Sequence, residues 1–67
     1  DMVAEAVLEH FESMIEYYGA YGAILFRKHL HTYSRLGYEG AGSFRNRINR
    51  ITDVDEMRRE IEEFFLR

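Results

Sequence analysis

The 67-residue sequence contains no Cys, no Pro and no Trp. Without Cys, neither a disulfide nor a thiolate metal site can hold so small a chain together, so its stability must come from packed apolar side chains. The lack of Cys also favours a cytoplasmic location, since thiols stay reduced there. No apolar run approaches the roughly 20 residues that a helix needs to span a bilayer, and no stretch has the pattern of a signal peptide. These absences predict a domain with no membrane contact.

What the chain does have is apolar bulk, since 46% of its residues are hydrophobic and these include five Tyr and five Phe. A chain of this length forms one domain. We therefore expect residues 1–67 to be a single helical domain. Because the chain begins with Asp1 rather than an initiator Met, we also expect it to be a piece excised from a longer protein.

Apolar residues recur at helical spacing in four segments, 2–18, 20–36, 44–51 and 54–66. No segment alternates between apolar and polar residues with a period of two, which argues against a sheet. Gly19 is expected to end the first helix, because Gly readily takes the left-handed conformation there. Ser43 is expected to cap the third helix, and Asp53, with Glu56 three residues later, the fourth. The pattern predicts an all-α fold, a small four-helix bundle.

The formal net charge of −3 hides a strong segregation of charge along the chain. Residues 1–26 carry five acids and no Lys or Arg, a charge of −5. Residues 27–50 carry six basic residues and one acid, +5, whereas residues 51–67 carry six acids and three Arg, −3. Segregated charges can present a basic face even when the isoelectric point is acidic. The middle segment is therefore the candidate for binding a polyanion.

Two groups of basic residues lie in this middle segment. On the second predicted helix, four side chains project from one arc, Arg27, Lys28, His31 and Arg35. The third predicted helix adds guanidinium groups beside amides, namely Arg45, Asn46, Arg47, Asn49 and Arg50. Arg and Asn suit phosphate and sugar contacts, where Arg binds two oxygens at once. The alternative is a solvated face that balances the acidic first helix. Tyr38, between the two helices, either stacks on a base or packs against the bundle.

Other site chemistries find less support. The stretch 40–43 lacks the G-x-x-x-x-G-K-[ST] spacing of a nucleotide P-loop, so a plain turn is favoured over a bound phosphate. His29 and His31 point about 200° apart on a helix and cannot chelate together, so we expect no metal site, and His29 is expected to be a core residue. No nucleophile triad and no pair of carboxylates in an apolar setting is present. No catalytic residue is therefore assigned.

The segment 27–33, a Gly-containing loop and the segment 44–51 together resemble the C-terminal domain of bacterial tRNA-dihydrouridine synthases. The shared pattern is an "RKH…Y" helix followed by an "FR..IN.I" helix, and Tyr18-Gly19-…-Gly22 is similar to the "YG…G" turn of the family. The sequence is most similar to the DusB, or NifR-like, type. The match covers roughly residues 8–65 and rests on the order and spacing of these motifs.

The resemblance implies a division of labour within a longer enzyme. In the family, an N-terminal α/β barrel carries FMN, uses NADPH and holds a catalytic Cys that protonates uridine, while the helical domain helps bind and orient tRNA. For this chain the resemblance implies no cofactor of its own, tRNA as a partner, and a catalytic barrel domain as a second partner to which FMN and NADPH belong.

Carried over by position, the candidates for contacts with the tRNA backbone are Arg27, Lys28, Arg35, Arg45 and Arg50. Arg47 lies nearer the apolar side of its helix and is a candidate for pairing with an acid inside the bundle instead. His29 and Tyr33 belong to the motif but are expected to be structural. The rival interpretation is a docking module, in which an acidic or aromatic face binds a protein partner or the catalytic domain without touching RNA.

Overall fold

The computed structural model describes residues 2–66, of which about three quarters are helical and none forms a strand. The helices are α1 (Met2–Tyr18), α2 (Tyr21–Leu25), α3 (Arg27–Tyr33), α4 (Ala41–Ile48) and α5 (Val54–Phe65). Only Phe26 separates α2 from α3, and its backbone stays in the helical region (φ −74°, ψ −14°). These two segments therefore count as one interrupted helix. The predicted all-α four-helix bundle is confirmed.

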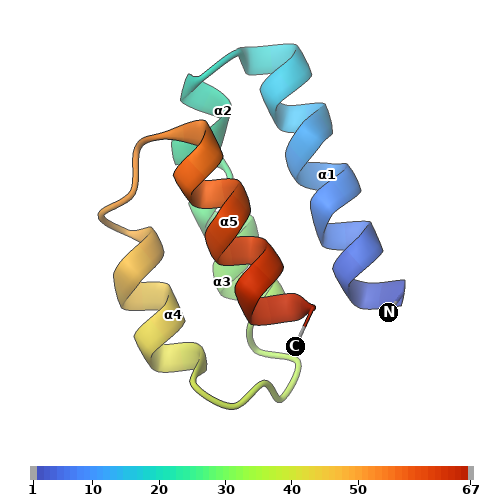
Figure 1. Cartoon of the computed structure of the whole chain (residues 1–67), viewed down its shortest axis with the longest axis vertical. Coiled ribbons are helices and arrows are strands. Elements are labelled where there is room, and N and C mark those ends of the chain that lie inside the picture. Colours follow the sequence, from blue (N-terminus) through green and yellow to red (C-terminus); the bar gives the residue numbers. More distant parts are fainter. Residues whose placement is uncertain (1, 67) are drawn as a thin grey trace.

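Successive helices of the bundle run in alternating directions (Figure 1). α1 packs against α2 and α5, while α4 packs against both α3 and α5. The start of α1 and the end of α5 lie at the same end of the molecule (Figure 1). Within residues 2–66, no helix is both long enough and apolar enough to cross a membrane.

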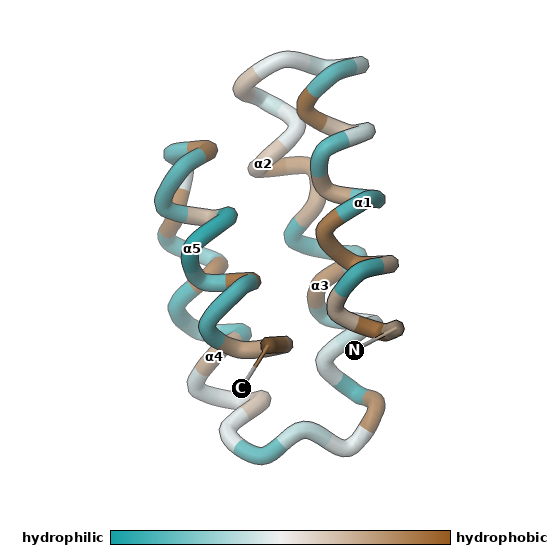
Figure 2. Tube along the Cα trace, turned by 45° about the vertical axis from the view of Figure 1, so that its right-hand side comes forward, coloured by the Kyte–Doolittle hydropathy of each residue, from teal (hydrophilic) through white to brown (hydrophobic). Residues whose placement is uncertain are grey.

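Aromatic side chains fill much of the core. All five Phe are buried, namely Phe11, Phe26, Phe44, Phe64 and Phe65. Phe44 of α4 stacks on Phe64 of α5, with ring centroids 4.1 Å apart, and Phe65 meets both rings edge-on. Figure 2 shows hydrophobic and hydrophilic positions alternating along α1 and α5, as expected for helices with one face in the core. Burial of these rings is the main source of stability in a chain without disulfides.

Two glycines shape the turn between α1 and α2. Gly19 takes a φ of +70° and donates its N–H to the Ile15 carbonyl at 2.8 Å, so the predicted end of the first helix is confirmed. At Gly22, a Cβ atom would lie only 2.6 Å from the Met14 carbonyl oxygen. The backbone of α2 thus approaches that of α1 more closely than any residue with a side chain would allow.

The third predicted helix differs from the observed one at both ends. α4 begins at Ala41, after Gly40 with a φ of +78°, and Ser43 lies inside the helix with no capping role. The expected Ser43 cap is wrong because the left-handed conformation of Gly40 lets the chain enter the helix earlier. α4 also ends at Ile48 instead of Ile51. The predicted cap of the last helix is confirmed, since the Asp53 carboxylate accepts the N–H of Glu56 at 2.9 Å.

The second predicted helix, over 20–36, is both interrupted at Phe26 and shorter than expected. It ends at Tyr33, and the chain then passes through turns to Gly37, which has a φ of +91°. Leu36, the last apolar residue of the predicted helix, is 63% exposed because it lies in this turn and no longer on a helix.

Candidate nucleic-acid interface

α3 and α4, which carry most of the predicted basic residues, lie antiparallel to each other. Three hydrogen bonds cross between α3 and the α4 region: Arg27 Nη2 to the Ile51 carbonyl at 2.6 Å, His31 Nε2 with Asn49 Oδ1 at 2.9 Å, and Arg45 Nη1 to Ser34 Oγ at 3.0 Å. Residue numbers rise along α3 as they fall along α4. The structure therefore brings the two basic segments of the sequence together on one pair of helices.

This pairing divides the basic arc of α3 into two rows. Arg27, His31 and the turn residue Ser34 form the row that contacts the α4 region. The neighbouring row contains Lys28 and Arg35, both exposed to solvent. Helix α3 carries only part of each row, since it ends at Tyr33 and both Ser34 and Arg35 lie in the turn that follows. The predicted position of Arg35 on the helix is therefore wrong. Only the second row is free to meet a ligand without disturbing the contact between the helices.

Arg27 is a half-buried residue with a structural contact. Its Nη2 donates to the Ile51 carbonyl, in the connection between α4 and α5, and its Nε is buried with no partner among the described residues. This hydrogen bond links α3 to the segment that connects α4 and α5. The contact of Arg27 with tRNA stays a prediction.

Arg45 is also engaged in the fold. It is half-buried, and its guanidinium donates to the hydroxyl of Ser34, a residue that is only 1% exposed. The Ser34 hydroxyl in turn donates to the His31 carbonyl at 3.0 Å, so this buried polar group is satisfied in both roles. The sequence did not predict a role for Ser34, because no local pattern shows that a Ser after one helix will contact an Arg of the next helix.

The other basic residues separate into a paired one and free ones. Arg47 Nε forms an ion pair with Glu60 of α5 at 2.9 Å, which confirms the expected pairing with an acid. Its expected place inside the bundle is wrong, because Arg47 is exposed and the pair lies at the surface. Lys28, Arg35 and Arg50 are exposed, and none of their charged groups has a hydrogen bond or ion pair with another residue in the described part of the chain. These three are the cations most available to phosphate, and their role in RNA binding stays a prediction.

An open groove of about 460 Å³ runs between α4 and α5. Its lining is mostly polar and includes Asn46, Arg47, Arg50, Ile51, Glu56 and Glu60. The isoalloxazine ring of a flavin needs flat apolar walls as well as a few placed polar groups. Charged side chains dominate this groove, so its residues do not fit FMN.

Tyr38, in the loop before α4, packs against the end of α5. Its ring centroid lies 5.3 Å from that of Phe64 and 5.0 Å from that of Phe65, and the residue is half-buried. The interpretation of Tyr38 as a packing residue is confirmed. Its ring extends the aromatic cluster that joins the α3–α4 loop to the core.

The motif residues His29 and Tyr33 pack against His10 of α1. Tyr33 Oη and His10 Nδ1 are hydrogen-bonded at 3.0 Å, and the two imidazole rings lie 4.5 Å apart. Burial holds the pKa of His29 below its ordinary value, and the nearby charges of His10 and Lys28 add to this shift. The structural role expected for His29 and Tyr33 is confirmed, although His29 is half-buried and not fully inside the core.

No group of three metal-ligating side chains gathers anywhere in residues 2–66.

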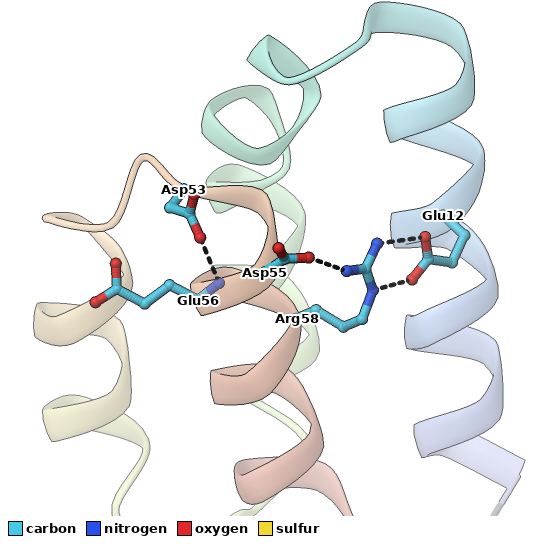
Figure 3. A network of polar contacts seen from close by, with 5 residues as sticks. All are labelled: Glu12, Asp53, Asp55, Glu56 and Arg58. Atoms are coloured by element: carbon cyan, nitrogen blue, oxygen red, sulfur yellow. Dashed lines mark hydrogen bonds and ion pairs between the residues drawn. The ribbon is translucent and has the colours of Figure 1, made fainter.

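The acidic face of α1 is joined to α5 through one guanidinium (Figure 3). Arg58 donates from Nε and Nη2 to the two carboxylate oxygens of Glu12, at 2.5 and 2.9 Å, and from Nη1 to Asp55 at 2.8 Å. The guanidinium also lies 5.6 Å from the centroid of the Phe11 ring. The hydrogen bond from Arg58 holds the pKa of Glu12 below its ordinary value. This network stabilises the side of the bundle away from α3 and α4.

Fold and site together define a small helical bundle with a cationic face on α3 and α4. Two proteins named probable tRNA-dihydrouridine synthase, from two strains of Helicobacter pylori, are each 51% identical to this chain over 61 residues. The alignment covers 91% of this chain but 18% of each relative, so the chain spans about a fifth of the proteins it matches. The resemblance to tRNA-dihydrouridine synthases is confirmed. No family model and no solved structure matches the chain.

Proposed function

We propose that this chain is the tRNA-binding helical domain of a tRNA-dihydrouridine synthase. It positions tRNA for the reduction of a uridine by a barrel domain outside this chain, to which FMN and NADPH belong. The observation that carries the proposal is the 51% identity to two proteins of that name. In this division of labour the chain binds RNA in the cytoplasm and contributes no catalytic residue.

The free cations of the α3–α4 face support this function. Lys28, Arg35 and Arg50 project into solvent, where they can neutralise phosphates without breaking a contact of the fold. Folded RNA is recognised largely through its shape and its phosphate and 2′-hydroxyl groups, a task that suits a few spaced cations. Three phosphate contacts correspond to a slope of about −2 to −3 in a plot of log affinity against log salt concentration. We therefore expect weak binding by this chain alone, with a clear dependence on salt.

An NMR titration of the labelled chain with tRNA tests the proposal. Amide shifts are expected to cluster on residues 27–50 at low salt and to diminish at moderate salt. Shifts confined to α1 or α5, or no shifts at low salt, would show that the α3–α4 face does not bind tRNA.

A second candidate function is docking on a protein surface, and exposed aromatic side chains favour it. Tyr17, Tyr18 and Tyr21 are 81%, 49% and 60% exposed at the corner between α1 and α2, and the rings of Tyr17 and Tyr18 are in contact at 4.7 Å. Helical spacing places Tyr18 on the apolar stripe of the first helix, but it is the last residue of α1 and about half of it is exposed. Tyr is enriched in the cores of protein interfaces, so this corner suits contact with the catalytic domain.

Charge reversal in the full-length enzyme distinguishes the two functions. Lys28→Glu and Arg35→Glu together should abolish most tRNA modification if the domain binds RNA. If modification survives while circular dichroism shows a folded protein, the docking function is favoured. Arg27, a third member of the basic arc, is left unchanged because its contact with Ile51 makes it part of the fold.

A further inference from the structure

The groove between α4 and α5 is lined by two cations and two anions. Arg47 and Glu60 neutralise each other within the groove at 2.9 Å. The guanidinium of Arg50 and the carboxylate of Glu56 also line it, but neither of these charged groups has a hydrogen bond or ion pair with another side chain in the described chain. Figure 3 shows the Glu56 side chain extending from α5 toward α4, away from the Arg58 network. The groove therefore offers one free cation and one free anion.

The Glu56 carboxylate lies in the first turn of α5, where it favours the N-terminal end of the helix, but it also repels phosphate on the neighbouring face. A carboxylate accepts hydrogen bonds, so it is suited to the donors on the edge of a base. Guanine is the RNA base whose Watson–Crick edge presents two adjacent donors, N1–H and N2–H₂, which match the two oxygens of one carboxylate. Unpaired RNA bases are commonly read along this edge. The guanidinium of Arg50 is available to the phosphate of the same nucleotide.

The size and lining of the groove suit a nucleotide that remains part of an RNA strand. Its volume of about 460 Å³ falls within the range of small-ligand sites. Ser43 and Asn46 provide neutral donors and acceptors for the sugar, and Ile51, which is 8% exposed, provides apolar surface for the base. The groove is open to solvent, so the strand can enter and leave it.

We propose that the α4–α5 groove binds an unpaired guanosine of an RNA strand, with Glu56 recognising the base and Arg50 its phosphate. This inference rests on the proposed RNA-binding function and adds a base preference to it. It also gives a role to a carboxylate that a purely electrostatic interface would exclude.

Four single-stranded pentanucleotides that differ only in the central base, with uridine on either side, test this proposal. Titrated into the labelled chain at low salt, the RNA with central guanosine is expected to bind at least about five-fold more tightly than the other three. Its shifts are expected at Ser43, Arg50 and Glu56. In the Glu56→Gln variant the preference for guanosine should disappear while weak binding through Arg50 remains. The matched control is Glu63→Gln, which changes an exposed carboxylate of α5 outside the groove and should keep the preference.

Equal affinity for the four pentanucleotides, or a preference that survives in Glu56→Gln, would overturn the inference. The proposed function is judged separately by the tRNA titration. If tRNA shifts the α3–α4 residues but no base is preferred, the chain binds RNA without reading guanosine. If guanosine is preferred at the groove but tRNA does not bind, the groove is a nucleotide site and the proposed function fails.

Discussion

Arg27 of α3 donates a hydrogen bond of 2.6 Å to the carbonyl of Ile51, which lies in the connection between α4 and α5. The two residues are 24 positions apart in the sequence. The sequence motif predicts that Arg27 contacts RNA. In the structure Arg27 is half-buried and bound to a backbone carbonyl, so it also has a structural role.

The first prediction concerns the stability that Arg27 provides. Arg27→Ala should lower the free energy of unfolding by about 1–3 kcal/mol, because the Ile51 carbonyl loses its partner in a partly buried setting. Urea denaturation followed by circular dichroism measures this. Lys28→Ala, on the exposed row beside it, is the control and should change stability by less than about 0.5 kcal/mol. Equal stability of the two variants would mean that the Arg27 contact contributes nothing.

The second prediction compares two glycines with opposite surroundings. Gly22→Ala should destabilise the chain by about 1–3 kcal/mol or more, since its Cβ would lie 2.6 Å from a backbone oxygen of α1. Gly42 lies in α4, and a Cβ atom added there would meet nothing within 4 Å. Gly42→Ala should therefore stabilise the chain by about 0.4–1 kcal/mol through the entropy of the unfolded state. Thermal unfolding of both variants checks the prediction, which fails if Gly22→Ala is neutral.

These residues show what the sequence could and could not predict. Helical spacing of apolar residues predicted the class of fold and the whole extent of α1, because the pattern is long and local. The start of α4 was missed because Gly40 and Ser43 are both reasonable helix starts. Only the tertiary path of the loop decides between them.

The candidate site was predicted less completely than the fold. The sequence identified which residues are basic and which helices carry them. Whether a guanidinium meets solvent or a partner depends on a second helix, as with Arg27 and Ile51 or Arg45 and Ser34. Such contacts join residues far apart in the chain, and no local pattern encodes them. The pairing of Arg47 with an acid was predicted correctly, but its location inside the bundle was not, because the residue is exposed and meets Glu60 at the surface.

The third prediction is a pH dependence that arises from His29. Burial lowers its pKa in the folded state relative to the ordinary value of 6.5, so the unfolded state binds the proton more readily. The free energy of unfolding should therefore fall as the pH is lowered through and below 6.5. His29→Gln should reduce this dependence in urea denaturation at several pH values. An NMR titration that gives His29 a pKa above 6.5 would contradict the sign.

The fourth prediction concerns Glu12 and Arg58, which join α1 to α5. The pKa of Glu12 is lowered by its hydrogen bond with Arg58, so its stabilising contribution is present above a pH of about 4.5 and is lost as the pH falls through the folded-state pKa. A double-mutant cycle with Glu12→Gln and Arg58→Gln should give a coupling of about 0.5–1 kcal/mol at pH 7, since the pair is partly exposed. The coupling should shrink at pH 3. A coupling that is zero at pH 7, or unchanged at pH 3, is the contrary result.

The central claim is that the exposed cations on α3 and in the turn after it bind tRNA, and single charge reversals measured by tRNA affinity test it most directly. Arg59→Glu is the matched control, because Arg59 is exposed on α5, away from this face. At low salt, Lys28→Glu and Arg35→Glu should each weaken tRNA binding by roughly three- to ten-fold and reduce the salt slope by about 1, whereas Arg59→Glu should change the affinity less than two-fold. Equal losses in all three variants, or no loss at Lys28 and Arg35, would contradict the account.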